Sequence, residues 1–349
     1  MKAAGGRVVL RRCGVKPRTL TALSVVTAAG VVVSLLNLFS GEYIASPMEV
    51  VAVLGGSGTA VDDAVLVSLR APRVLLALVV GAALGISGAI AQTISRNGLA
   101  TPELLGVTGG ASVGAIAVIV VGGSSGQFTD VARALGIPAA AILGGLVAAA
   151  IILVILRAVG TTGAAPILVG IGLSAMFAGL VSWLLIAASL EELRRANVWL
   201  TGTLNGRSWP ELLSVTVVLV VCMIALVPIL RNLDTLTLGD EVATGLGVRV
   251  GRTTGIFIVI AVILAATTTA VAGPIAFVSL VAPHLARMVL AQSRPSLALS
   301  GLLGAVLLAA SDLAARTVAV VQLPTGAIAA IVGAPFLVFL LLQKRRDHR

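Results

Sequence analysis

The most distinctive polar stretch of this sequence is LTLGDEVATGLGVRVGR, residues 236–252, which separates two long apolar windows. We predict a short helix over 239–246. Asp240 and Glu241 would lie in its first turn, where the positive end of the helix dipole favours carboxylates. A glycine follows its last residue, as is common in the left-handed turn after a helix. Two helical turns are unstable alone in water, so this helix must dock on a larger body.

The chemistry that these residues predict is binding rather than catalysis. Val242, Ala243 and Leu246 would share one face of the short helix and present apolar surface. The residues expected to make the contact are Gly239, Asp240, Glu241, Val242, Ala243, Leu246 and Gly247.

Catalytic and cofactor motifs give no competing interpretation. The sequence has no HExxH, no CxxC pair and no GxxxxGK[ST], so we expect no catalytic residues, no metal site, no cofactor and no ATP binding by this chain itself. The two cysteines, Cys13 and Cys222, lie in different environments and predict no disulfide. We expect a non-enzymatic protein.

Ionisable groups inside a membrane are the usual sign of ion coupling. Apart from Glu211, the first residue of one window, and Arg287 near the end of another, the apolar windows of this chain contain no Asp, Glu, Lys or Arg. We take His284 in VAPHLAR as the one candidate. We interpret His284, next to Pro283, as a structural group at a helix kink rather than a proton relay.

The elements that must position these residues are membrane helices. Hydrophobic residues make up 58% of the 349 and charged residues 11%, which is too apolar for a soluble domain of this size. The predicted class is an all-α polytopic membrane protein with about ten transmembrane helices. The windows are 20–40, 74–95, 104–122, 135–156, 164–188, 211–230, 254–272, 275–290, 296–311 and 325–342.

An even number of spans places both ends on one side, and both ends are basic. The positive-inside rule then puts them in the cytoplasm. We predict a cytoplasmic segment over 1–19, one transmembrane domain over 20–343 with a cytoplasmic coupling segment at 236–252, and a cytoplasmic tail over 344–349. The net charge of +10 is spread between apolar windows and aromatics are 3%, so nucleic-acid binding is excluded.

Three smaller patterns predict features of individual helices. Gly81 with Gly85, and Gly106 with Gly110 and Gly114, have the spacing that lets helices approach closely. EELRRANVWL, 191–200, predicts a short amphipathic helix on the membrane surface. Thr267, Thr268 and Thr269 can either line a pathway or bond to carbonyls of their own helix, and we favour the second role.

Several segments, in register over most of the chain, resemble the FecCD-like permeases of ABC importers for iron-siderophores, haem and cobalamin. They are the coupling stretch above, LRAPRVLLALVVGAALGISGAIAQTISRNGLATPELLGVTGGASVGA (69–115), VWLTGTLNGRSW (198–209), AGPIAFVSLVAPHLAR (272–287) and SDLAART with LPTGAIAAIVGAPFLVFLL (311–341). Two departures are Gly98, where the family usually has Pro, and Ser279, where Gly is common.

The resemblance implies a type II importer permease with a BtuC-like fold in the bacterial inner membrane. It implies a second permease chain, two ATPase subunits that contact the coupling segment, and a substrate-binding protein on the outer face. Arg70, Arg73 and Arg316 match family positions that dock this binding protein; the alternative is that they snorkel at helix ends. The expected cargo is an iron-siderophore chelate, with haem or cobalamin as alternatives. The competing function is an ATP-independent secondary carrier or channel.

Overall fold

The computed structural model describes residues 17–40, 46–55, 57–124, 130–159, 165–318 and 322–347. Within these ranges the chain is helical, without strands, which confirms the predicted class. Seven segments are long and apolar enough to cross a membrane, those of α1, α4, α6, α7, α9, α12 and α14. Three shorter apolar helices lie in α5, α13 and α15. Each of these helices overlaps one of the predicted windows.

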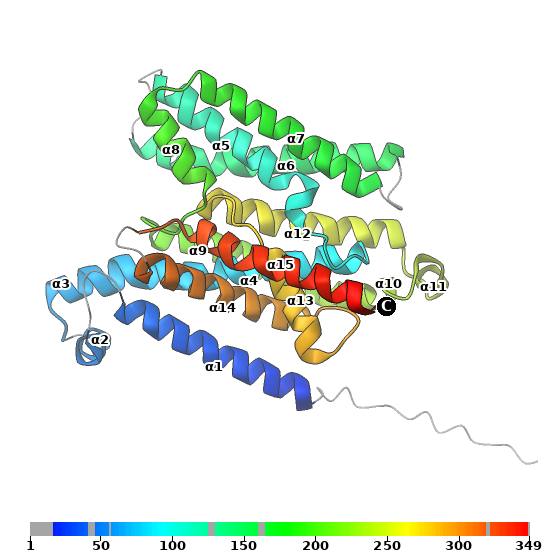
Figure 1. The fold of residues 1–349 in the computed structure, drawn as a ribbon, viewed down its shortest axis with the longest axis horizontal. Coiled ribbons are helices and arrows are strands. Elements are labelled where there is room, and N and C mark those ends of the chain that lie inside the picture. The colour runs from blue at the N-terminus through cyan, green and yellow to red at the C-terminus, as the bar shows by residue number, and fades with distance from the viewer. Residues whose placement is uncertain are drawn as a thin grey trace, which may run out of the picture.

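Most of the long helices run side by side along the longest axis of the molecule (Figure 1). Their bounds are α1 Pro17–Phe39, α4 Ala71–Ile94, α5 Val107–Ser124, α6 Asp130–Val159, α7 Ala165–Ile186, α9 Trp209–Leu226, α12 Val250–Ala272, α13 Val278–Leu290, α14 Leu297–Thr317 and α15 Thr325–Asp347.

Short elements connect the long helices and gather at the two ends of the bundle (Figure 1). One end carries α2 Pro47–Leu54, α3 Ala60–Asp62 and α8 Leu190–Leu200, and the other carries α10 Leu230–Leu236 and α11 Asp240–Gly245. Three non-α turns complete the chain: the π-helical η1 Asp63–Arg70 and the 3₁₀ turns η2 Pro102–Leu105 and η3 Val227–Ile229.

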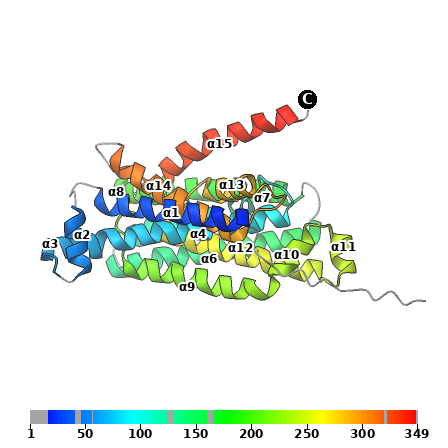
Figure 2. The ribbon, with the colours of Figure 1, turned by 90° about the horizontal axis from the view of Figure 1, so that it is seen from below.

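Both described ends of the chain lie at the α11 end of the bundle (Figure 1). Figure 2 shows that α15 leaves the bundle at an angle and points away from it. The predicted tail is helical as far as Asp347, the last described residue. Residues 1–16 of the predicted leader and 348–349 of the tail lie outside the described residues.

Glycine contacts hold the central helices at close range. A Cβ on Gly81 would lie 2.3 Å from the carbonyl oxygen of Gly304, and one on Gly114 would lie 2.1 Å from that of Ala140. The predicted packing role is therefore confirmed for α4 against α14 and for α5 against α6. Gly106 differs: it precedes α5 with a φ of 71°, so it serves a turn.

The window predicted over 275–290 is shorter in the structure. Gly273 has a φ of 74° and Phe277 a φ of 69°, so residues 273–277 are irregular and α13 has only 13 residues. Such a helix is roughly 20 Å long, less than a bilayer core. The stretch 191–200 is helical as predicted, and α8 begins at a capping box of Ser189 and Glu192.

Candidate functional site

The short helix predicted within 239–246 is present as α11. Gly239 precedes it with a φ of 110°, and Gly247 follows it with a φ of 84°, values that L side chains rarely adopt. The amide of Gly247 donates to the carbonyl of Thr244 (2.9 Å), and the amide of Val248 donates to that of Ala243 (3.0 Å). These bonds satisfy carbonyls at the end of the helix, as in a glycine C-cap.

The exposed face of α11 is narrower than the sequence predicts. Ala243 is fully buried and packs in a cluster that includes Leu236 and Phe257. Val242 and Leu246 are 49% and 65% exposed. Ala243 therefore anchors the helix to the bundle, which corrects its place in the predicted contact face and leaves Val242 and Leu246 as the apolar surface.

Arg96 ties this end of α4 to the coupling segment. Its guanidinium donates to the carbonyl oxygen of Leu236 (2.8 Å) and forms an ion pair with Asp240 (2.5 Å). Arg96 also has a φ of 48°, a conformation that costs a non-glycine residue about 1 kcal/mol. This contact was not predicted, although Arg96 lies within the quoted 69–115 segment.

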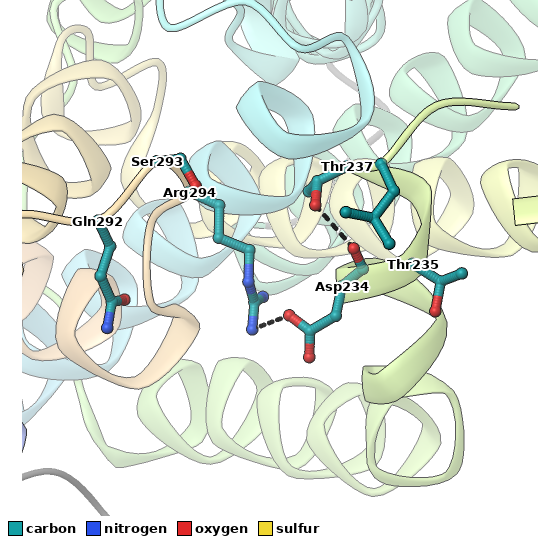
Figure 3. Close-up of a pocket in the computed structure, with 7 residues that line it drawn as sticks. Asp234, Thr235, Thr237, Gln292, Ser293 and Arg294 are labelled. Carbon is teal, nitrogen blue, oxygen red and sulfur yellow. Dashed lines mark hydrogen bonds and ion pairs between the residues drawn. The ribbon is translucent and has the colours of Figure 1, made fainter. Parts of the chain in front are cut away.

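A second arginine braces the neighbouring helix α10. Arg294, between α13 and α14, forms an ion pair with Asp234 across a pocket (Figure 3). The lining of this pocket also includes Thr235, Thr237 and Gln292. Two loops far apart in sequence thus hold α10 and α11 in place.

Replacing Arg96 with alanine should loosen α11 without unfolding the bundle. The ion pair is half-exposed and therefore weak, but the bond to the Leu236 carbonyl is also lost. We expect amide exchange over 236–247 to be about fivefold faster in hydrogen–deuterium exchange, which corresponds to about 1 kcal/mol. Arg231→Ala, on an exposed residue of α10, is the matched control. Equal exchange in the two variants would exclude the positioning role.

The opposite end of α4 carries a buried ionic cluster. Arg73 donates two hydrogen bonds to the carboxylate of Asp312 in α14. One comes from Nε (3.1 Å) and the other from a terminal guanidinium nitrogen (2.8 Å). Their side chains are 9% and 1% exposed. Asp312 also accepts from the hydroxyl of Thr325 (2.9 Å) and lies 3.5 Å from Nε of Arg316. One carboxylate thus connects α4, α14 and α15.

The arginines predicted to dock a binding protein are buried in this structure. Arg316, with a 5% exposed side chain, also donates to the carbonyl of Asn37 (3.0 Å), and Arg70 donates to the carbonyl of Leu38 (2.6 Å). Arg70 and Arg73 precede the predicted window 74–95, but in the structure they are helical and lie in η1 and α4. Docking stays a prediction, and the observed contacts are internal.

The same cluster corrects the expected absence of ionisable groups from the spans. The window predicted for α4 begins at 74, and the window predicted for α14 ends at 311. In the structure α4 begins earlier and includes Arg73, and α14 ends later and includes Asp312 and Arg316. Within the described residues, Asp312 is enclosed by its own arginines and Thr325. It therefore offers no free carboxylate to a coupling ion.

The threonines considered for a pathway are buried in α12. Thr267, Thr268 and Thr269 are 6%, 1% and 2% exposed, and the hydroxyl of Thr268 donates to the carbonyl of Ala265 (2.9 Å). This bond is the helix-internal alternative that the sequence analysis favoured. A pathway role for the three residues has no support from these contacts.

His284 has a structural environment. Its Nδ1 accepts a hydrogen bond from the guanidinium of Arg287 (2.7 Å), and its ring meets Phe336 edge-on with centroids 5.8 Å apart. A proton relay needs a chain of exchangeable groups, and an arginine does not release its proton. These contacts agree with the interpretation of His284 as a packing residue between α13 and α15.

Both departures from the family pattern have local contacts. The hydroxyl of Ser279 lies 2.7 Å from both carboxylate oxygens of Glu103 in η2. Burial raises the pKa of Glu103, and the bond from Ser279 opposes that shift. A Cβ on Gly98 would lie 2.5 Å from the guanidinium of Arg287, so glycine leaves room for that side chain.

Metal ligands do not gather in the part of the chain that the structure describes. No group of three or more His, Cys, Asp or Glu side chains there can hold an ion. The site with a recognisable geometry is the coupling segment, with α11 exposed at one end of a helical bundle and braced by two arginines.

The family comparison agrees with this geometry. A model described as the FecCD transport family matches residues 28–343. The chain belongs to the FecCD transport family. Membership identifies it as a membrane-spanning transport permease.

Two relatives are similar to this chain in sequence over nearly its whole length. It is 36% identical over 333 residues to the ferric enterobactin transport system permease protein FepG of Escherichia coli strain K12, covering 95% of this chain and 98% of the relative. It is 34% identical to the iron(3+)-hydroxamate import system permease protein FhuG of Bacillus subtilis strain 168, with 90% and 94% covered.

A solved structure supports the FecCD fold. A chain described as belonging to an ABC transporter of the metal-chelate type, in an inward-facing conformation, superposes with a TM-score of 0.82. It is 29% identical and the match covers 93% of this chain and 99% of that one. The predicted BtuC-like importer fold is thus confirmed.

Proposed function

We propose that this permease carries an iron-siderophore-type chelate inward, driven by ATP hydrolysis in a separate ATPase subunit. The observation that carries the proposal is α11, a helix too short to be stable alone, held at one end of the bundle with Val242 and Leu246 exposed. Its apolar surface suits a partner from the same side. FepG and FhuG, which resemble the whole chain, are named for ferric enterobactin and iron(3+)-hydroxamate.

The proposal includes the assembly and its orientation. Two ATPase subunits contact α11, a second permease chain completes the translocation path, and a substrate-binding protein delivers the chelate at the opposite end. Residues 1–19 and 344–349 then lie in the cytoplasm with α11, and 20–343 form one transmembrane domain in the inner membrane. The basic residues at both termini support this orientation.

The alternative is a secondary carrier or channel that works without ATP. An ion-coupled carrier needs a carboxylate that can exchange its proton or bind an ion within the membrane. Asp312 is held by Arg73 and Arg316, which occupy its oxygens. These contacts remove Asp312 as a candidate for ion coupling.

The test is uptake by a strain that lacks this chain. We expect the strain to lose accumulation of one class of labelled ferric siderophore and to regain it with the wild-type chain. Labelled haem and cobalamin, measured in parallel, distinguish the alternative cargoes. In reconstituted vesicles, accumulation should require the ATPase partner and ATP and persist with a proton ionophore. Accumulation by the permease alone would contradict the proposal.

A further inference from the structure

An open pocket of about 450 Å³ lies between the end of α9 and the start of α12. Its walls come from η3, α10, the segment after α11 and the first turns of α12. The residues that matter here are Ile229, Leu246, Arg249, Arg252 and Ile256. The pocket is within the size range of small-molecule sites.

Two arginines give this pocket an uncompensated positive charge. Arg249 immediately precedes α12 and Arg252 lies in its first turn, and both side chains are exposed. Of the described residues, none forms an ion pair or hydrogen bond with either guanidinium, whereas Arg96 and Arg294 at the same end of the bundle each pair with an aspartate.

Their place on the helix adds to this charge. The first turn of α12 presents unpaired backbone amides and the positive end of the helix dipole, where cations are disfavoured. Arg249 and Arg252 lie where the helix dipole disfavours cations, and exceptions to such local rules are typical of functional sites. An anion in the pocket would satisfy both guanidinium groups.

Apolar surface continues from the pocket along the helices. Ile256 lines the pocket and is 38% exposed, and Val259, about one turn further on α12, is 43% exposed. Val227, two residues before Ile229, is 66% exposed. A ligand that fits this surface has a negative head and an apolar tail.

We propose that this pocket binds an anionic phospholipid. Arg249 and Arg252 bind its phosphate, and one acyl chain lies along Ile256 and Val259. Basic pockets between membrane helices on the cytoplasmic side suit such head groups. The inference rests on the proposed orientation, with this end of the bundle in the cytoplasm, and on an ATPase contact made by α11 rather than by Arg249 and Arg252. It does not depend on the chelate that the transporter carries.

The test measures lipid bound to the purified full-length chain by native mass spectrometry. The probes are phosphatidylglycerol and phosphatidylcholine, offered at equal concentration in detergent. We expect wild type to retain phosphatidylglycerol in preference. The double variant Arg249→Gln with Arg252→Gln should lower that preference about 10- to 30-fold. Each basic residue near an anionic head group contributes about 1 kcal/mol, and about 2 kcal/mol converts to about 30-fold in affinity.

Three controls decide the outcome. Arg231→Gln, an exposed arginine outside the pocket, should leave the preference unchanged, and Arg249→Lys with Arg252→Lys should keep most of it. Competition by inorganic phosphate at the concentration of the lipid should be weak. The proposal fails if wild type shows no preference, if the folded double Gln variant keeps it, or if phosphate alone displaces the lipid, which would indicate a simple anion site.

Discussion

Asp312→Ala should be the most destabilising single change in this permease. It removes the carboxylate that accepts from Arg73, Arg316 and Thr325 and leaves two buried guanidinium groups without a counter-charge. Breaking a buried ion pair in this way costs about 3–5 kcal/mol. We expect a loss of that size in the free energy of unfolding, measured by denaturant titration of the purified chain in detergent.

Ser311→Ala is the matched control for Asp312. Ser311 is the neighbouring buried residue, and its hydroxyl bonds only within α14, to the carbonyl of Leu307 (2.8 Å). The double variant Arg73→Leu with Asp312→Leu should lose less stability than the two single variants together, because each partner is costly mainly when left alone. If Asp312→Ala and Ser311→Ala unfold alike, the cluster is not a stabilising contact.

Val242→Asp combined with Leu246→Asp should abolish ATP-driven uptake. Both side chains are exposed, so the bundle should fold normally, while the two carboxylates would be buried without partners against an ATPase. Loss of two central apolar contacts lowers association by at least about 30-fold. Co-purification with the ATPase subunit and uptake into vesicles are the measurements.

The control for this pair places one new carboxylate at the other end of the molecule. Val198 in α8 is 56% exposed, and Val198→Asp should leave co-purification with the ATPase unchanged. If the Val242 and Leu246 double variant keeps both the ATPase and uptake, the coupling surface lies elsewhere. Uptake lost with association intact would instead assign these residues to transmission.

The sequence was sufficient for features that depend on local patterns. The apolar windows predict the long helices because twenty uncharged residues have few alternatives to a membrane span. The turn glycines predict α11, and the spacing of Gly81 and Gly85 predicts close helix packing, for which the structure supplies the partner α14. Ala243 shows the limit, since the face that a helix buries depends on which neighbour is present.

The ionic cluster could not be predicted because it joins residues far apart in the chain. Arg73 and Asp312 are 239 positions apart, and each lies just outside an apolar window, where a solvated loop is the ordinary expectation. Only the approach of α4 to α14 makes them partners. Arg96 was missed for a similar reason: its ion-pair partner Asp240 is 144 positions away, and its other bond is to the backbone of Leu236.

Because α4 is bonded to other helices at both of its ends, it can transmit motion along its length. Arg73 fixes it at one end and Arg96 at the other, and its 24 residues extend roughly 36 Å between them. A rod of that length that pivots by about 5° shifts its far tip by about 3 Å, enough to separate hydrogen-bonded groups. A small displacement of α11 would therefore rotate α4 as a rigid body and shift the region around Asp312, with little of the motion absorbed by bending of the helix.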